Sequence, residues 1–194
     1  MGIRVGFLDN VARSKVSPSS SRSVRAICIH GLGPKTRGPL VDGPYWENWG
    51  LALDVERIFH FDRVFEMHDP KVWRELGAPP PPEDIMNQIE ASLFMRDEYE
   101  DFPKAVKYPM DMVREFVKCE PACSGAMMFA LALTKNPLVI RCLGFDLDLP
   151  EHRYQRECMA YLKGVAVGLA VDVEGIDHLT AFRPYGTEVL GAVQ

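Results

Sequence analysis

The segment VRAICIHG, residues 24–31, is an almost unbroken apolar run that stops abruptly at glycine. A strand with one face in water would alternate apolar and polar residues, whereas a run of this kind is typical of a strand buried on both faces. A second such run, PLVIRCLG, occupies residues 137–144. Strands buried on both faces need helices on each side, so the chain is expected to build a mostly parallel sheet.

Strand and helix patterns alternate along the rest of the chain. Further strands are expected at 49–53, at 62–69 and at the end of 151–173. Helices are expected at 85–95, 108–117, 124–133 and the first part of 151–173. Ser124 stands where the buried helix needs an N-cap. We therefore predict an α/β fold, a Rossmann-like three-layer sandwich, built as a single domain by residues 1–194, with the serine-rich 1–22 as a flexible N-terminal extension.

The composition is that of a globular protein, with 47% hydrophobic and 25% charged residues. No apolar run approaches the roughly 20 residues that span a bilayer, and the N-terminus lacks an apolar signal core, so no membrane association is expected. The five cysteines are odd in number and sit in apolar surroundings, which favours a reducing, cytoplasmic location. A net charge of −5 gives no support to a nucleic acid partner, although it leaves room for a local basic groove. Nothing in the sequence indicates the oligomeric state.

Ligands of open parallel sheets bind beyond the carboxyl ends of the strands, and the predicted strands end in three polar segments. These are residues 30–36, the pair His68 and Asp69, and residues 144–148. His68 is the best candidate for a general base, because an ordinary imidazole titrates near neutral pH and Asp69 follows it directly. A buried, hydrogen-bonded structural histidine is the alternative. Asp146 is expected to act with them at the catalytic centre, for example by holding a sugar hydroxyl; the alternative is a helix-cap or turn residue.

The glycine-rich segment GLGPKT, residues 31–36, has two functional interpretations. In the first, the backbone at Gly31, Gly33 and Pro34 approaches a phosphate, and Lys35 and Thr36 add charge and a hydroxyl. The pattern is neither the dinucleotide fingerprint nor a Walker loop, and a plain connecting turn is the alternative. In the second, the loop supplies an oxyanion hole of an α/β-hydrolase, which the absence of G-x-S-x-G disfavours.

Four further residues are candidates for contacts with a nucleotide. Trp49 can stack on a base or pack in the core, and Ser124 offers a hydroxyl beside the amides of a helix N-terminus. Gly144 ends a core strand at the ligand edge. Arg156 can bind a phosphate through two nitrogens or pair with an acidic neighbour on its own helix.

The acidic residues after the strand at 137–144 raise the question of a metal. Asp146, Asp148 and Glu151 can bind Mg²⁺ or form a solvated loop. No histidine or cysteine cluster indicates a transition metal site. His30, the last residue before the glycine loop, is either a structural histidine or a proton donor to a leaving phosphate.

The order of the motifs resembles a group of small phage-type proteins of Rossmann-like fold. The motifs that carry the resemblance lie within residues 25–187 and are G-x-G-P, WENWGL, DRVFEMH, YP, a serine-led apolar helix, GFD, YQRE and a late YG. The G-x-G-P loop and the strand ending in G-x-D are also distantly similar to bacterial sialyltransferases and to MptE-like pyrophosphokinases.

The resemblance implies a nucleotide or sugar nucleotide at the carboxyl edge of the sheet, with Gly31, Gly33 and Pro34 facing its phosphates or ribose. The leading hypothesis is a phage-type glycosyltransferase, cytoplasmic in the host cell, that acts on a nucleotide or nucleic acid. His68 would deprotonate the acceptor, and the loop at residues 31–36 would hold the diphosphate. The alternatives are a nucleoside N-glycosidic bond enzyme, a pyrophosphokinase-like enzyme and a nucleotide-binding protein without catalysis.

Overall fold

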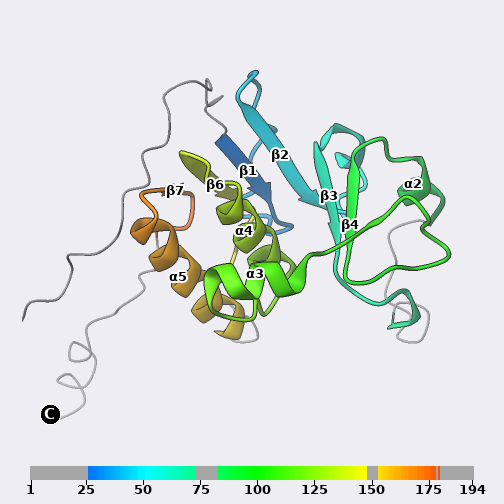
Figure 1. Cartoon of the computed structure of the whole chain (residues 1–194). Helices are drawn as coiled ribbons and strands as arrows, with labels where there is room; N and C mark the ends of the chain where they lie inside the picture. The colour runs from blue at the N-terminus through cyan, green and yellow to red at the C-terminus, as the bar shows by residue number, and fades with distance from the viewer. Residues whose placement is uncertain (1–25, 73–82, 148–152, 178, 180–194) are drawn as a thin grey trace, which may run out of the picture.

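The computed structural model describes residues 26–72, 83–147, 153–177 and 179 (Figure 1). The predicted N-terminal extension, residues 1–22, lies outside this part of the chain, as do Asp148 and Glu151.

The described residues build a seven-stranded sheet in the order β5-β4-β3-β2-β1-β6-β7. The strands are β1 (Ala26–His30), β2 (Trp46–Leu51), β3 (Arg63–Glu66), β4 (Ser92–Met95), β5 (Val106–Lys107), β6 (Val139–Leu143) and β7 (Asp172–Glu174). Every neighbouring pair is parallel, with Ile29 of β1 opposite Trp49 on one side and Cys142 on the other. The predicted α/β fold with a mostly parallel sheet is confirmed.

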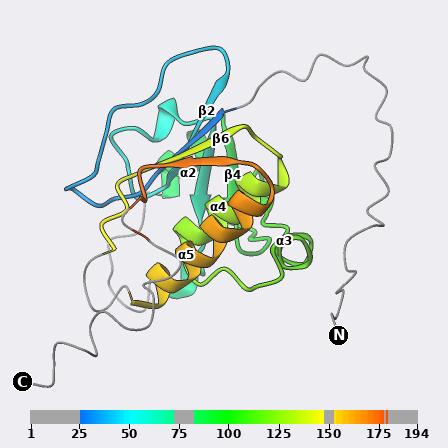
Figure 2. The same cartoon turned by 90° about the vertical axis from the view of Figure 1, so that its left-hand side faces the viewer.

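Helices cover both faces of the sheet and form the outer layers of a sandwich. They are α2 (Glu83–Gln88), α3 (Met110–Val117), α4 (Ser124–Thr134) and α5 (Arg153–Gly168), with a 3-10 turn, η1 (Ile58–His60). Figures 1 and 2 show α3, α4 and α5 together on one face, where Ile29 and Phe65 pack against Phe129 of α4. A second apolar cluster, formed with α2 and η1, joins Val64 to Met86. Alternate residues of β3 and β4 thus enter different clusters, as the pleat requires.

The helix predicted at 85–95 is the main error in the sequence-based assignment. Helix α2 ends at Gln88, and Ser92–Met95 form strand β4 between β3 and β5. Ile85, Ile89 and Leu93 do recur at helical spacing, but Leu93, Phe94 and Met95 are all buried in the strand. A short apolar run buried on both faces has the same periodicity signal in a helix and in a strand, so spacing cannot separate the two.

The start of α4 also differs from the prediction. The N-cap is Cys123, whose sulfur accepts a hydrogen bond from the Ala126 amide at 3.4 Å, and Ser124 is the first helical residue. Because Cys123 is the N-cap, the Ser124 side chain is not needed for capping, and it lines a cavity described below.

Candidate functional site

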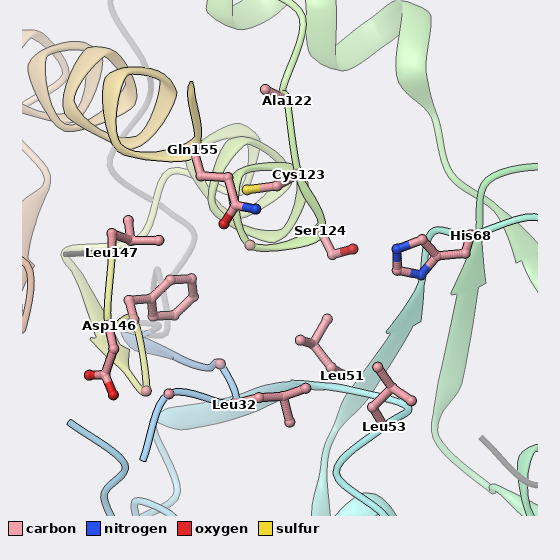
Figure 3. A pocket seen from close by; sticks show the side chains of 15 residues that line it. Leu32, Leu51, Leu53, His68, Ala122, Cys123, Ser124, Asp146, Leu147 and Gln155 are labelled. Carbon is pink, nitrogen blue, oxygen red and sulfur yellow. The ribbon is translucent and has the colours of Figure 1, made fainter. Parts of the chain in front are cut away.

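A cavity of about 420 Å³ lies at the carboxyl ends of β1, β2, β3 and β6 (Figure 3). The chain leaves β1 toward β2 on one side and later returns to β6 on the other, so the strand order reverses between β1 and β6. Two neighbouring strands whose connections leave in opposite directions open a crevice beyond their ends, where ligands of such sheets bind. The starts of α4 and α5 face the strand ends and complete the cavity.

The loop after β1 is held against the loop after β6 by a series of backbone hydrogen bonds. The amides of Gly31 and Gly33 donate to the carbonyls of Leu143 and Gly144 at 2.7 and 2.8 Å. The Gly144 amide in turn donates to the Thr36 carbonyl at 2.9 Å. The amides of both glycines are therefore occupied within the protein and are not presented to an anion, contrary to the cradle interpretation.

The close approach of these two loops explains their glycines. A Cβ atom at Gly31 would lie 2.4 Å from the Gly144 carbonyl oxygen, and one at Gly33 would lie 2.6 Å from Cγ of Asp146. Gly144 has a φ of +75°, a conformation that residues with a side chain rarely adopt. Gly31, Gly33 and Gly144 all line the cavity, but their glycine identity serves the contact between the loops.

The Asp146 carboxyl group ties the same two loops together. It accepts hydrogen bonds from the Lys35 amide at 2.6 Å and from the Thr36 hydroxyl at 2.7 Å. Burial raises the pKa of Asp146, but these hydrogen bonds, from the Thr36 hydroxyl first, outweigh it and hold the pKa below its usual value. Figure 3 shows the carboxyl group pointing away from Ser124 and His68. The Asp146 carboxyl group therefore positions the loop at residues 31–36 against the loop after β6.

His68 and Glu66 form a hydrogen-bonded pair at the end of β3. Glu66 is the last strand residue and only 3% of its side chain is exposed, whereas 56% of the His68 side chain is exposed. Oε1 of Glu66 lies 2.6 Å from Nδ1 of His68 and also accepts the His68 amide at 3.0 Å. When Nδ1 carries the proton and donates to Glu66, Nε2 has a free lone pair.

The pair also sets the proton affinity of the imidazole. The hydrogen bond to Glu66 raises the pKa of His68 above its usual value, and partial burial opposes that shift less strongly. His68 lines the cavity, and its ring projects from the β3 end toward Ser124 (Figure 3). A ring oriented by a buried carboxyl group and open to a cavity is suited to act as a general base.

Helix α4 begins at the wall of the cavity that faces His68. Ala122, Cys123, Ser124 and Gly125 line it, and the Ser124 hydroxyl points toward the His68 ring (Figure 3). The N-terminus of a helix carries a partial positive charge and favours an anionic group. This end of the cavity is therefore the best-placed region for a phosphate or carboxylate.

Helix α5 contributes two neighbouring residues with different tasks. The Gln155 amide extends into the cavity (Figure 3). Arg156 uses Nε and Nη2 to donate to the Leu147 carbonyl at 3.0 and 2.7 Å. The two-nitrogen contact that we predicted for a phosphate is thus made with the backbone, and Arg156 is not among the residues that line the cavity.

Several other predicted contacts also lie outside the cavity. Trp49 is 0% exposed and packs in the core, with its indole nitrogen donating to Glu47 at 3.0 Å, so it cannot stack on a ligand. The Asp69 carboxyl accepts the Lys71 amide at 2.8 Å and acts electrostatically on Tyr99. Neither residue, nor any of Pro34, Lys35 and Thr36, lines the cavity.

Sequence reasoning missed Glu66, the partner of His68. The signal was present, because residues two apart at a strand end lie on the same side of the chain, and the sequence there reads Glu-Met-His. The prediction chose the adjacent Asp69 instead. Gln155 belongs to the YQRE motif, from which only Arg156 was selected as a ligand contact, and the leucines of the cavity carried no signal because leucine is common in loops and at strand ends.

The cavity has little charge. Among the described residues that line it there is no lysine or arginine, and Asp146 is the one acidic residue. The described part of the chain contains no cluster of three or more histidine, cysteine or acidic residues arranged to hold a metal. Two of the three predicted Mg²⁺ ligands, Asp148 and Glu151, fall outside that part. Nor does any described helix have the length and apolar character to cross a membrane.

Comparison with known proteins shows similarity at the level of fold. No protein-family model and no curated protein matches the chain. The sialyltransferase CstII from Campylobacter jejuni, in complexes with the substrate analogue cytidine-5'-monophosphate and with CMP-3FNeuAc, aligns with a TM-score of 0.50 and 13% identity. The alignments cover 82% of this chain and 85% and 86% of those chains.

A third solved structure, the apo form of an alpha-2,3-sialyltransferase from the same organism, aligns with a TM-score of 0.50 and 18% identity over 79% of this chain and 76% of that one. The distant likeness to bacterial sialyltransferases, predicted from the G-x-G-P and G-x-D motifs, is therefore present in the fold. The likeness to phage-type proteins and to MptE-like pyrophosphokinases stays a prediction.

Proposed function

We propose that this protein is a glycosyltransferase that uses a sugar nucleotide, with His68 as the general base. The observation that carries the proposal is the His68 ring, oriented by the buried Glu66 at 2.6 Å and open to a cavity at the ligand edge of a parallel sheet. The fold that the chain shares with sialyltransferases solved with CMP and CMP-3FNeuAc supports it.

The transfer step follows from that geometry. The acceptor hydroxyl gives its proton to Nε2 of His68 while its oxygen bonds to the anomeric carbon of the donor sugar. The bond from that carbon to the phosphate oxygen breaks, and the nucleotide leaves with the bonding electrons. Glu66 keeps the proton of the imidazole on Nδ1 before transfer and stabilises the imidazolium formed by it.

The spacing of the strands suits a sugar ring between the nucleotide and the base. The crevice lies between β1 and β6, whereas His68 follows β3, two strands from β1. Neighbouring strands are about 4.8 Å apart, so the β1 and β3 ends are separated by roughly 10 Å. That separation fits one sugar ring and the reacting bond.

The low charge of the cavity favours a donor with one phosphate. A diphosphate without a metal would need cationic side chains, and the described lining has neither lysine nor arginine. The amides of Gly31 and Gly33, which we expected to hold a diphosphate, are bonded to the β6 loop. The α4 N-terminus with Ser124 is suited to a single phosphate or a sugar carboxylate.

The same lining bears on the acceptor. A nucleic acid acceptor would be expected to meet lysine or arginine at its phosphates, and the cavity offers none among its described residues. We therefore propose a small-molecule acceptor. A phage origin stays a prediction from the sequence resemblance.

The proposal is tested by separating binding from turnover. CMP, at 100 times its dissociation constant, should stabilise the protein by about 2.7 kcal/mol and raise its melting temperature. His68→Ala should keep that shift and lose roughly 10²- to 10⁴-fold in the turnover of a CMP-linked sugar. His60→Ala, at an exposed histidine of η1, is the matched control and should change neither. Unaltered turnover in His68→Ala, or no thermal shift with any nucleotide, contradicts the proposal.

A further inference from the structure

Three leucines surround the approach to His68. Leu32 follows β1, Leu51 is the last residue of β2, and Leu53 comes two residues later. The Ala52 amide donates to the Phe65 carbonyl of β3 at 3.0 Å, which places the β2 end beside the segment that leads to His68. All three leucines line the cavity together with His68; Figure 3 shows Leu51 and Leu53 below the imidazole and Leu32 farther to the left, toward Asp146.

Two of these leucines are exposed to solvent at the cavity. Leu32 is 43% exposed and Leu53 is 39% exposed, whereas Leu51 is partly buried and packs against the main core. Leu32 and Leu53 therefore form an apolar mouth over a floor made by Leu51. Exposed apolar groups gathered around a cavity indicate that an apolar part of a ligand covers them.

The position of the mouth assigns it to the acceptor. In the proposed function the nucleotide occupies the β1/β6 crevice, and the acceptor must present its hydroxyl to His68, beyond β2. The polar side chains of the described lining, which are His68, Ser124, Gln155 and Asp146, come from β3, α4, α5 and the β6 loop. The β2 end supplies leucine alone among them, so it has no side-chain group with which to hydrogen-bond a sugar or a phosphate.

We infer that the acceptor is an alcohol or glycoside with an alkyl or aryl group next to the reacting hydroxyl, which packs on Leu32, Leu51 and Leu53. The inference rests on the proposed glycosyl transfer and adds its acceptor class. The apolar group excludes water around Nε2 of His68, so the acceptor hydroxyl, rather than water, reaches the base.

The test compares acceptors that differ in their apolar part alone. With CMP-N-acetylneuraminic acid as donor, KM is measured for octyl β-galactoside, below its micelle concentration, and for methyl β-galactoside. A group that fills an apolar pocket changes specificity by tenfold or more, so KM for the octyl compound should be at least roughly tenfold lower. Leu53→Asn should reduce that ratio to within about twofold.

The matched control is Leu169→Asn at the end of α5. Leu169 is 40% exposed, almost the same as Leu53, and does not line the cavity, so the ratio should stay at its wild-type value. Melting temperatures of both variants show whether each is folded.

The outcomes separate the acceptor class from the proposed function. Equal KM values for the two galactosides, or better transfer to a thymidine oligonucleotide, overturn the apolar acceptor while transfer itself stands. A ratio unchanged in Leu53→Asn overturns it as well. A wild-type protein that neither transfers nor hydrolyses any sugar nucleotide overturns the proposed function, and the acceptor class with it.

Discussion

The ends of β1 and β3 each carry a histidine, and the two side chains have opposite surroundings. His30, the last residue of β1, is 1% exposed, whereas His68, two residues beyond β3, is 56% exposed. Burial lowers the pKa of His30, and the hydrogen bond to Glu66 raises the pKa of His68. Both were candidates for acid–base chemistry from their place in the sequence.

His30 is held in a network that leaves it no part in the cavity. Its Nε2 donates to Asn48 at 3.0 Å, and Nδ1 lies 3.5 Å from a guanidinium nitrogen of Arg57, which only donates. The ring also contacts Phe61, a member of the cluster on the α2 face, whereas α4 closes the cavity on the other face. A histidine still inside the strand is therefore a structural group, and one beyond the strand end can face a ligand.

The largest effect is expected from removing the carboxylate that contacts His68. Glu66→Gln keeps a hydrogen-bonding side chain but not a carboxylate, so turnover should fall roughly 10- to 100-fold, the range seen when the hydrogen-bond partner that orients a metal-ligating histidine is removed. Turnover by a general base rises with pH as the imidazole loses its proton. The apparent pKa of that rise should lie above about 6.5 in the wild type and move down in the variant. A pH profile identical in both proteins would refute the assigned pairing.

A second prediction concerns the rigid β1 end. In Gly31→Ala the new methyl group would lie 2.4 Å from the Gly144 carbonyl oxygen, so we expect a loss of about 1–3 kcal/mol in the free energy of unfolding. Denaturant titration measures it. Gly164→Ala is the control, because no atom outside the adjacent backbone of its own helix lies within 4 Å of its Cβ position, and it should stabilise by about 0.5–1 kcal/mol. Equal stability of the Gly31 variant and the wild type would show that the two loops can separate.

The smallest expected effect is the pH dependence that His30 gives to stability. Its pKa is lowered in the folded state, so as pH falls below about 6.5 the unfolded chain binds a proton that the folded chain does not. The contribution of neutral His30 to the free energy of unfolding is complete above that pH. It is lost as the pH falls toward the pKa that His30 has in the folded state. His30→Gln should therefore lose less stability than the wild type between neutral pH and pH 5, in paired denaturant titrations. A steeper loss in the variant would mean that His30 binds its proton more readily in the folded state.

Local patterns in the sequence were enough to predict the parallel sheet and the edge of it at which the cavity lies. The β1 run is apolar without alternation and the β6 run is interrupted by Arg141 alone, which is close to the pattern of strands covered on both faces. His68, Gly31 and Ser124 stand at the ends of such strands or at the start of a helix, where parallel sheets place ligand contacts. These inferences depend on patterns within one segment and on a general property of parallel sheets, so the sequence was sufficient for them.

Tertiary structure alone decided which polar groups remain available at that edge. Trp49 is enclosed by the core. The Asp146 carboxyl accepts from the backbone of the β1 loop, and the Arg156 guanidinium donates to the backbone after β6. The run at β4 is a strand rather than a helix, and its backbone pairs with β3 on one side and β5 on the other. Each outcome depends on atoms brought together from distant parts of the chain, and burial and hydrogen bonding between such atoms leave no mark in local spacing.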